Sequence, residues 1–377
     1  MNGNSAPLFN DLGGIYHWQN SNSGRTQVMG NTEDDVGAAR SGRVRIADIA
    51  RELGLNPSTV SRAISNPNRV NPETHKLVAQ TARRMGYTAN HLARSLRTGR
   101  TNTLLVAAPS QPGLPISPVV IDVLHGIFFE AGRMGYSVFI RETDPSGMAP
   151  TNRRPLSGLA DGIISISGTA EIIQSGGLAA EMAHLPLISL LTDQTQLNIP
   201  SLIADEAAGL YQAADYLIRQ GHVKLAYIAG PLDISEHDRP RYQGFCRRLE
   251  ESGLLDGHVR IEGGSYDFSS GTRAAETFLD LPDKPTAVIG VSDAVALGFI
   301  RRIKDAGLRV PEDVAVIGYD DLAYSAYTSP SLTTISQPTV EIGKAGTRLL
   351  IDACSGRFDL KPQLITMPTH LVRRESA

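Results

Sequence analysis

Cysteine is almost absent from this chain of 377 residues, and the two that occur, Cys246 and Cys354, lie far apart. A disulfide framework needs several pairs of cysteines, and a metal site built on paired cysteines needs close spacing, so neither is predicted. No run of about 18 apolar residues occurs, which excludes a transmembrane helix. Residues 1–40 contain no basic segment leading into an apolar stretch, so no secretory signal is predicted. We therefore expect a cytoplasmic protein with no membrane partner.

The sequence patterns of common catalytic sites are missing as well. The chain contains no G-x-x-x-x-G-K-[ST] phosphate loop, no G-x-S-x-G turn and no H-E-x-x-H helix, and its nine histidines are scattered. Asp320 and Asp321 are adjacent carboxylates, but adjacent side chains point in different directions and cannot flank a substrate as an acid and a base. We expect no enzyme activity, no cofactor and no bound metal.

Charge is distributed unevenly along the chain, although the net charge is only -3. Residues 43–100 carry eleven Lys and Arg against three Asp and Glu, a net charge of +8, whereas residues 101–377 carry -9 and residues 1–42 carry -2. Clustered cations neutralise phosphates, so a small basic module joined to an acidic body is typical of a nucleic-acid-binding protein with a separate sensor. A solvated charged face is the alternative.

Three short helices are predicted in residues 43–88. Apolar residues at helical spacing predict a first helix over Val44–Leu53. Asn56 suits an N-cap before a proline, so a second helix is predicted over Pro57–Ile64. A third is predicted over Pro72–Met85, with an inward face of Leu77, Val78, Ala82 and Met85. Helix, tight turn and helix together indicate a helix-turn-helix domain.

The second of these helices carries side chains suited to DNA. Its outward positions are short hydroxyls and one guanidinium, which reach phosphates and base edges: Ser58, Thr59, Ser61 and Arg62. In residues 89–100, arginines recur at three-residue steps around Leu96, which suits a minor-groove wedge flanked by phosphate contacts. A purely structural bundle, followed by a linker helix whose Leu96 contacts the neighbouring domain, is the alternative.

From Thr103 onward, short apolar runs alternate with helical stretches. Such alternation predicts parallel sheets covered by helices, with ligands bound beyond the carboxyl ends of the strands. Roughly 270 residues exceed the usual size of one such unit, so residues 101–377 are predicted to form two α/β subdomains around a cleft. The predicted strands are Leu104–Ala107, Ser137–Ile140, Gly162–Ser165, Leu187–Leu190, Lys224–Ala229, Ala287–Gly290 and Val314–Gly318.

Polar side chains follow several of the apolar runs or stand close to them. Carboxylates, a guanidinium and an amide are groups that form paired hydrogen bonds with the hydroxyls of a sugar or nucleoside. For Asp205 and Asp293 helix capping is the alternative, because each precedes a predicted helix. The candidate ligand-binding residues at these positions are Asp205, Arg241, Ser292, Asp293, Asp320 and Gln337.

The stretch ADIARELGLNPSTVSRAISNPNRVNPETHKLVAQTARRMGYTANHLARSLRTGRTNTLLV resembles the N-terminal region of the lac-repressor family. The resemblance implies that Pro57, Ser58 and Arg62 are reading positions of a recognition helix. It also implies a hinge helix over residues 89–96 whose Leu96 enters the minor groove at the centre of a palindromic operator. Many members have threonine before the first helix, where this chain has Arg45, so we expect an uncapped helix and a phosphate contact there. The expected DNA-contacting residues are Arg45, Ile46, Pro57, Ser58, Thr59, Ser61, Arg62, Asn90, Arg94, Leu96 and Arg97.

Further segments resemble the core of the same family: GHVKLAYIAGP, DRPRYQGF, PTAVIGVSDAVALG, VPEDVAVIGYDD and SPSLTTISQP. The resemblance implies a homodimer with a periplasmic-binding-protein-like core that holds a small polar effector between its subdomains. The chain is expected to cross between these near 203–209, 336–339 and 364–368. Tyr266 and Phe268 fall where members present an aromatic side chain to the ligand, with core packing as the alternative. NPNRV and GSYDFSSG are similar to phrases of nucleoside-responsive members.

The predicted fold is thus α/β, with a small all-α helix-turn-helix domain (43–88) and a hinge helix and linker (89–100) joined to a two-subdomain core (101–377). The predicted function is repression of transcription at a double-stranded operator under the control of a sugar or nucleoside. A DNA-bending architectural protein, a solute-binding protein and an enzyme on the same fold are the alternatives. Residues 1–42 fall outside the resemblance and are expected to be a disordered extension, or to lie upstream of a working start at Met29.

Overall fold

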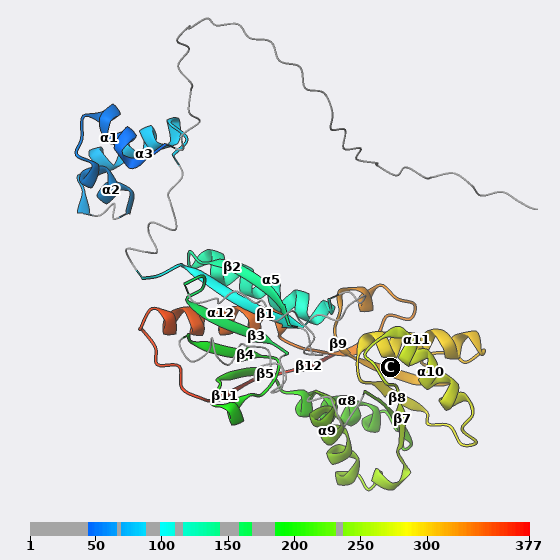
Figure 1. The fold of residues 1–377 in the computed structure, drawn as a ribbon. Helices are drawn as coiled ribbons and strands as arrows, with labels where there is room; N and C mark the ends of the chain where they lie inside the picture. The colour runs from blue at the N-terminus through cyan, green and yellow to red at the C-terminus, as the bar shows by residue number, and fades with distance from the viewer. Residues whose placement is uncertain are drawn as a thin grey trace, which may run out of the picture. The chain divides into compact units, whose positions relative to one another are not determined.

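The computed structural model describes residues 44–65, 69–87, 99–109, 116–143, 158–167, 185–230 and 237–377. The chain divides into two compact units, Met1–Ala89 and Asn90–Ala377 (Figure 1). The expected extension over residues 1–42 and most of the expected hinge helix lie outside the described residues. The hinge positions concerned are Asn90, Arg94, Leu96 and Arg97.

The first unit is a bundle of three helices, α1 (Ile46–Leu53), α2 (Pro57–Ser65) and α3 (Pro72–Arg84). The predicted helices are confirmed to within two residues at each end. Gly54 ends α1 with a φ of 62°, a left-handed conformation that favours glycine. The centre of the bundle is apolar and consists of Ile49, Ala50, Val60, Ala63, Val78 and Ala82.

The inward face of α3 differs from the prediction at Leu77, which is 47% exposed. Val78, Thr81 and Ala82 are the buried residues of this helix, so the apolar stripe is centred one position later than expected. Leu77 lies at the edge of that stripe, and two short neighbouring helices do not cover it. The periodicity identified the helix correctly but placed one edge residue on the wrong side.

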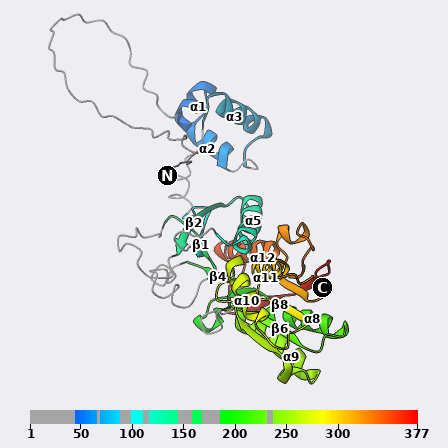
Figure 2. The same ribbon diagram turned by 90° about the vertical axis from the view of Figure 1, so that its right-hand side faces the viewer.

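The second unit contains two sheets of six strands each. The first has the order β11-β5-β4-β3-β1-β2, and all of its pairings are parallel. Helices α5 (Pro118–Arg133) and α12 (Thr339–Cys354) accompany it (Figure 2). Its strands are β1 (Thr103–Pro109), β2 (Ser137–Thr143), β3 (Gly162–Ile166), β4 (Leu187–Leu190), β5 (Ser201–Ala204) and β11 (Leu364–Met367).

The second sheet has the order β12-β10-β9-β8-β6-β7, in which β12 alone pairs antiparallel. Its strands are β6 (Leu225–Ala229), β7 (Val259–Glu262), β8 (Ala287–Gly290), β9 (Ala315–Asp320), β10 (Thr333–Ser336) and β12 (His370–Val372). Helices α8 (Glu206–Arg219), α9 (Asp238–Glu251), α10 (Phe268–Leu279) and α11 (Asp293–Asp305) pack around it. The predicted two-subdomain α/β architecture is confirmed.

The chain passes between the two sheets at three places, from β5 to α8, from β10 to α12 and from β11 to β12. Each sheet together with its helices is called a subdomain below. The first subdomain contains β1–β5, β11, α5 and α12, and the second contains β6–β10, β12 and α8–α11. No described helix offers an apolar stretch that would reach across a bilayer.

Helices α5 and α12 approach each other closely in the first subdomain. A Cβ atom at Gly126 would lie 2.1 Å from the carbonyl oxygen of Val340, so only glycine fits there. Glu130, one turn further along α5, is 1% exposed. Its carboxylate accepts hydrogen bonds from Arg133 Nη2 at 2.6 Å and from Arg348 Nε of α12 at 2.7 Å. The glycine contact and the carboxylate together join the two helices.

Glu130→Gln is expected to lower the free energy of unfolding by about 1–3 kcal/mol at neutral pH, the range for lost bonds to charged partners. The hydrogen bonds from Arg133 and Arg348 lower the pKa of Glu130 from 4.5 to about 2. This stabilisation is present above pH 4.5 and is lost as the pH falls towards 2, so the difference between variant and wild type should shrink in acid.

Urea denaturation of both proteins at neutral pH and in acid measures this effect. Glu341→Gln is the matched control, because its carboxylate is 57% exposed and lies 3.5 Å from Lys344. Equal losses for the two variants at neutral pH would contradict the role of Glu130.

Candidate functional site

The outward face of α2 is the candidate DNA-reading surface. Asn56 caps this helix as predicted, because its Oδ1 accepts from the N–H of Ser58 at 3.0 Å and from the Ser58 hydroxyl at 2.8 Å. Pro57, Ser58 and Arg62 are exposed, whereas Thr59 and Ser61 are half-buried. The hydroxyl and guanidinium of the exposed positions are placed for contact with phosphates and base edges.

The start of α1 differs in detail from the expectation of an uncapped helix. The side chain of Arg45 makes no capping bond, but Asp48 Oδ2 accepts from the N–H of Arg45 at 2.8 Å. Half of a capping arrangement is therefore present. Arg45 is exposed and available to a phosphate, while Ile46 is half-buried and packs against the bundle core.

A cavity of about 280 Å³ lies in the second unit and is lined by both subdomains. It lies beyond the carboxyl ends of the strands, since Ala204 ends β5, Asp320 ends β9 and Gln337 follows β10. This space is called the cleft cavity below. Its lining residues are Ser117, Pro118, Val119, Val120, Ser167, Leu191, Ala204, Glu206, His237, Arg241, Tyr266, Ser292, Ala294, Asp320, Leu322, Tyr324 and Gln337.

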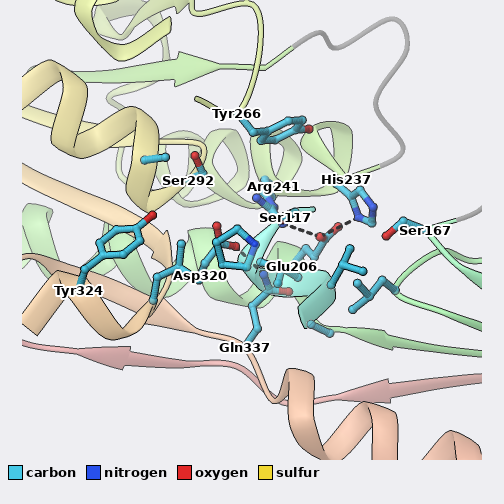
Figure 3. Close-up of a pocket in the computed structure, with 17 residues that line it drawn as sticks. Ser117, Ser167, Glu206, His237, Arg241, Tyr266, Ser292, Asp320, Tyr324 and Gln337 are labelled. Atoms are coloured by element: carbon cyan, nitrogen blue, oxygen red, sulfur yellow. Dashed lines mark hydrogen bonds and ion pairs between the residues drawn. The ribbon is translucent and has the colours of Figure 1, made fainter. Parts of the chain in front are cut away.

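Arg241 of α9 is the central cation of the cleft cavity (Figure 3). It is 5% exposed, and its Nη2 donates to Glu206 Oε1 at 2.9 Å while Nη1 donates to the carbonyl oxygen of Val291 at 2.6 Å. The guanidinium lies over the ring of Tyr319, 3.9 Å from the centroid. His237 Nδ1 lies 3.2 Å from the same oxygen of Glu206. Burial is the largest single influence on Glu206 and raises its pKa, but Arg241 and His237, through their charges and hydrogen bonds, together outweigh burial and lower the pKa of that carboxyl.

Asp320 lies close to this ion pair, at the end of β9. Gln337 Nε2 donates to Asp320 Oδ1 at 2.6 Å. Burial raises the pKa of Asp320 from 3.8 to about 8, although the charge of Arg241 acts in the opposite direction. A pKa of about 8 favours the protonated carboxyl at neutral pH, and this form offers a ligand both a donor and an acceptor.

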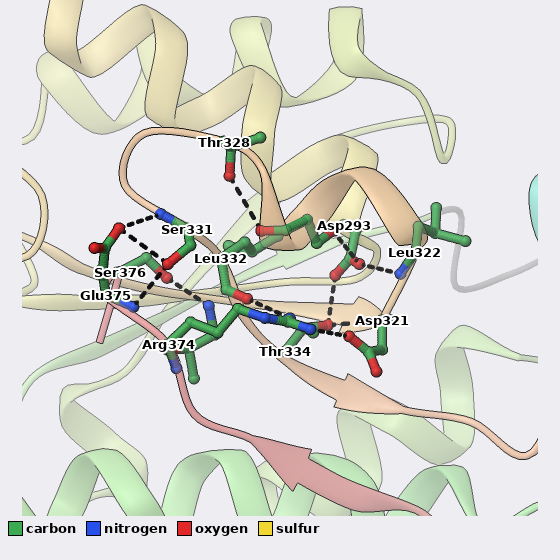
Figure 4. Close-up of polar contacts among 12 residues, drawn as sticks. Asp293, Asp321, Leu322, Thr328, Ser331, Leu332, Thr334, Arg374, Glu375 and Ser376 are labelled. Carbon is green, nitrogen blue, oxygen red and sulfur yellow. Dashed lines mark hydrogen bonds and ion pairs between the residues drawn. The ribbon is translucent and has the colours of Figure 1, made fainter.

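The backbone at Asp320 and Asp321 is strained, with φ values of 118° and 56°. Residues with side chains adopt such values only where the surroundings impose them, at a cost of about 1–3 kcal/mol each. The C-terminal residues supply one such constraint (Figure 4), because Arg374 Nη2 donates to Asp321 Oδ1 at 2.6 Å and Nη1 donates to the carbonyl oxygen of Leu332 at 2.8 Å. Asp320 and Asp321 thus have separate partners, as expected for adjacent carboxylates.

Asp293 forms hydrogen bonds with the residues that follow Asp321 (Figure 4). It is fully buried, and its Oδ2 accepts from the N–H of Leu322 at 2.8 Å and from the hydroxyl of Ser325 at 2.7 Å. Oδ1 accepts from the hydroxyl of Thr334. Asp293 is therefore placed to position Leu322 and Tyr324, which line the cleft cavity.

Five of the residues expected to contact an effector line the cleft cavity, namely Arg241, Tyr266, Ser292, Asp320 and Gln337. Asp205, Asp293 and Phe268 do not line it. Asp205 caps α8 by accepting from the N–H of Ala208 at 3.0 Å, which is the alternative foreseen for it. Phe268 is 52% exposed and packs near Tyr324, with ring centroids 6.1 Å apart, in a groove outside the cavity.

Other lining residues had no role in the sequence analysis. Glu206 directly follows Asp205. Had Asp205 been assigned as the helix cap, Glu206 would have remained as the carboxylate at that strand end that is free to face a ligand. His237 directly precedes α9, and Tyr324 lies in a short 3-10 helix, Ala323–Ala326, that follows β9. Ser117 and Ser167 belong to the first subdomain. Ser117 precedes Pro118 at the start of α5, a pattern that indicates the start of a helix but not a place in the cavity.

Comparison with known proteins extends over both units. Residues 45–90 match the model of the bacterial regulatory proteins of the lacI family, and residues 214–377 match that of a periplasmic binding protein-like domain. The transcriptional repressor CytR of Escherichia coli (strain K12) is 31% identical over 313 residues, which cover 82% of this chain and 89% of that protein. The catabolite control protein A of Priestia megaterium is 32% identical over 337 residues, which cover 88% and 99% of the two chains.

The fold is similar to that of a lac repressor dimer crystallised with its operator and the anti-inducer ONPF. That similarity has a TM-score of 0.75 with 26% identity, and it covers 89% of this chain and 99% of the other. The matches include the helix-turn-helix unit as well as the unit that contains the cleft cavity. This chain therefore belongs to the lacI family of bacterial regulatory proteins.

Proposed function

We propose that the protein is a transcriptional repressor that binds a two-fold symmetric operator as a homodimer and responds to a small sugar or nucleoside. One observation carries this function: a single chain joins a helix that presents Ser58 and Arg62 to solvent with a cavity that is lined by Arg241 and Asp320. The protein acts in the cytoplasm, without catalysis, metal or cofactor.

The effector binds in the cleft cavity. Hydroxyl groups of a sugar or ribose donate to Glu206 and Asp320 and accept from Arg241 and Gln337, and all four side chains line the same space. Tyr266 and Tyr324 offer aromatic faces for a ring, on different sides of Ser292 (Figure 3). Three residues lie behind the lining: Asp205 caps the helix that begins with Glu206, Asp293 bonds to Leu322 and Ser325, and Phe268 lies against Tyr324.

A second copy of the chain covers an apolar surface on α5 and β2. On α5, Phe129 is 62% exposed and Ile121 and Phe128 are exposed as well; on β2, Phe139 is 56% exposed and Ile140 is exposed on the other face of the strand. Clustered large apolar side chains on a folded surface mark an interaction site. Two copies related by a two-fold axis would present two α2 helices to the two halves of a symmetric operator. The lac repressor of similar fold is likewise a dimer bound to an operator.

Selection of duplexes from a random DNA pool by the purified full chain tests this function. The expected product is an inverted repeat that binds about a thousandfold or more tighter than scrambled DNA at the same salt concentration. Tight binding with no preference for any sequence would instead favour a DNA-bending architectural protein. If the protein bound no duplex, the proposed regulatory function would be wrong.

Arg62→Ala is expected to weaken binding to the selected operator by about 10- to 100-fold and to relax preference at one base pair in each half-site, because each bidentate base contact contributes ~1–3 kcal/mol. Competition binding against operators with single substitutions measures both effects. Arg84→Ala is the control, since Arg84 lies on α3 and pairs with Glu52 at 2.8 Å. If Arg84→Ala relaxed the preference at the same base pair, α2 would not be the reading helix.

A further inference from the structure

The described lining of the cleft cavity contains a single Lys or Arg, Arg241, and that cation is already paired. Glu206 Oε1 lies 2.9 Å from its Nη2. The two side chains are 8% and 5% exposed, so water screens neither charge well. Arg241 consequently has N–H groups to offer a ligand, but its positive charge is neutralised within the protein.

Most described lining residues lie in stretches of sequence without Lys or Arg. Residues 101–132, 155–218, 285–300 and 310–343 contain no Lys or Arg at all. These four runs contain all the described lining residues except His237, Arg241 and Tyr266. A strongly negative group on a ligand would therefore find neither a free guanidinium nor an ammonium among the residues that line the space.

The other lining carboxyl, Asp320, does not change the net charge of the described lining at neutral pH. Burial raises its pKa to about 8, which favours the uncharged carboxyl at neutral pH. Apart from the imidazole of His237, which lies 3.2 Å from Glu206 Oε1, the described lining then carries one negative and one positive charge, on Glu206 and Arg241. An uncharged polyol fits such a lining, because its hydroxyls pair with both groups without adding a charge.

Four helices begin beside the cavity, namely α5, α8, α9 and α11. The first turns of α8, α9 and α11 each contain an acidic residue, Glu206, Asp238 and Asp293, whereas that of α5 contains none, so the N-terminus of α5 is the one of the four left to attract an anion. Pro118 occupies its first helical position and has no N–H to donate. The next two residues, Val119 and Val120, line the cavity with apolar side chains. The end of a helix is equivalent to about half an elementary charge, whereas Glu206 carries a full one in a buried place. Glu206 therefore dominates the electrostatic selection.

We propose that the effector is an uncharged polyhydroxylated compound, a free sugar or nucleoside, and that Glu206 excludes its phosphate ester. The inference rests on the proposed function of the cleft cavity as the effector site. Glu206 acts as a specificity-determining residue: an anion beside Arg241 is also beside Glu206, and the buried ion pair cannot open without leaving a charge unpaired.

Titration calorimetry of the full chain with matched pairs tests the proposal: cytidine and cytidine 5′-monophosphate, ribose and ribose 5-phosphate, and glucose and glucose 6-phosphate. At least one free compound is expected to bind, and its ester to bind about tenfold or more weakly, because like charges in a poorly screened site repel. The ratio of the Kd of the ester to the Kd of the free compound should be about threefold or more smaller in Glu206→Gln, since glutamine keeps the acceptor for Arg241 and removes the charge. Glu251→Gln, which removes an exposed carboxylate bonded to Tyr211 at 2.6 Å, should leave the ratio unchanged.

An ester that binds wild type as tightly as its free partner would overturn the proposal, and the wild-type titrations decide this even if Glu206→Gln fails to fold. An unchanged ratio in folded Glu206→Gln would overturn the role of Glu206. If no compound of any pair binds, the named effector class is wrong. Selection of DNA is measured without any ligand. A protein that selects an operator but fails the ligand tests would therefore still be a DNA-binding regulator, and only the effector proposal would be wrong.

Discussion

Asp320→Asn is expected to make the unliganded protein more stable than wild type at pH 8. Folding raises the pKa of this carboxyl from 3.8 to about 8 through burial, so the folded chain favours the protonated form. The stability associated with that proton is fully present below pH 3.8 and is lost as the pH rises through 8. Asparagine is uncharged at every pH and keeps the acceptor for Gln337, so the variant does not undergo this loss.

The expected gain in the free energy of unfolding is a few kcal/mol at pH 8, since each pKa unit corresponds to ~1.4 kcal/mol and part of the side chain faces the open cavity. It should shrink steadily as the pH is lowered towards 4. Thermal and urea denaturation of both proteins across this range measure it. Effector affinity should fall in the same variant, because the carboxyl that recognises a ligand is the one that costs stability.

Asp313→Asn is the matched control, because the shift of its pKa has the opposite sign. Hydrogen bonds from Arg309, one of them at 2.8 Å from Nη2, lower the pKa of Asp313 to about 2. This variant should be slightly less stable than wild type at both pH 5 and pH 8, with no change between them. If Asp320→Asn followed the same pattern, the Asp320 carboxyl would be ionised in the folded protein and its assigned state would be wrong.

The sequence predicted the part of the site that follows from sheet geometry. Asp320 and Gln337 stand at the ends of apolar runs, and parallel strands bring such ends to one edge of a sheet. The choice between Asp205 and Glu206 needed the structure. Both carboxylates fall at the start of α8, and only the backbone there shows that Asp205 caps the helix while Glu206 lines the cavity.

The sequence did not predict several of the short strands, nor the exposure of side chains such as Leu77 at the edge of a helix face. Strands β5, β7 and β10 were not among the predicted strands; each has four residues and begins or ends with a polar one, so it does not stand out as an apolar run. Strands β4 and β8 are equally short but were predicted as apolar runs. Leu77 has the spacing of a core residue, but the amount of neighbouring surface decides burial and periodicity does not report it. Ser117 and Ser167 reach the cavity only through the pairing of two subdomains, a long-range property that no local pattern contains.

Arg241→Met is expected to lower the free energy of unfolding by about 3–5 kcal/mol, because it leaves the Glu206 carboxylate buried without its main partner. Glu206 is 8% exposed, so water cannot replace the guanidinium. The double variant Arg241→Met/Glu206→Gln should recover the greater part of that loss, since methionine fills the space of the arginine stem and glutamine needs no counter-charge. Urea denaturation of wild type, both single variants and the double variant completes the cycle.

Effector affinity, measured in the same four proteins, shows whether the ion pair contributes to stability or to ligand recognition. A buried ion pair that an uncharged pair can replace at little cost contributes little net stability, so its value to this protein lies in recognition. The double variant should therefore be nearly as stable as wild type and yet lose affinity for the free compound by about 100-fold or more, because Arg241 supplies hydrogen bonds to a ligand that methionine cannot make. A double variant as unstable as Arg241→Met would instead assign the loss to packing around the guanidinium and Tyr319.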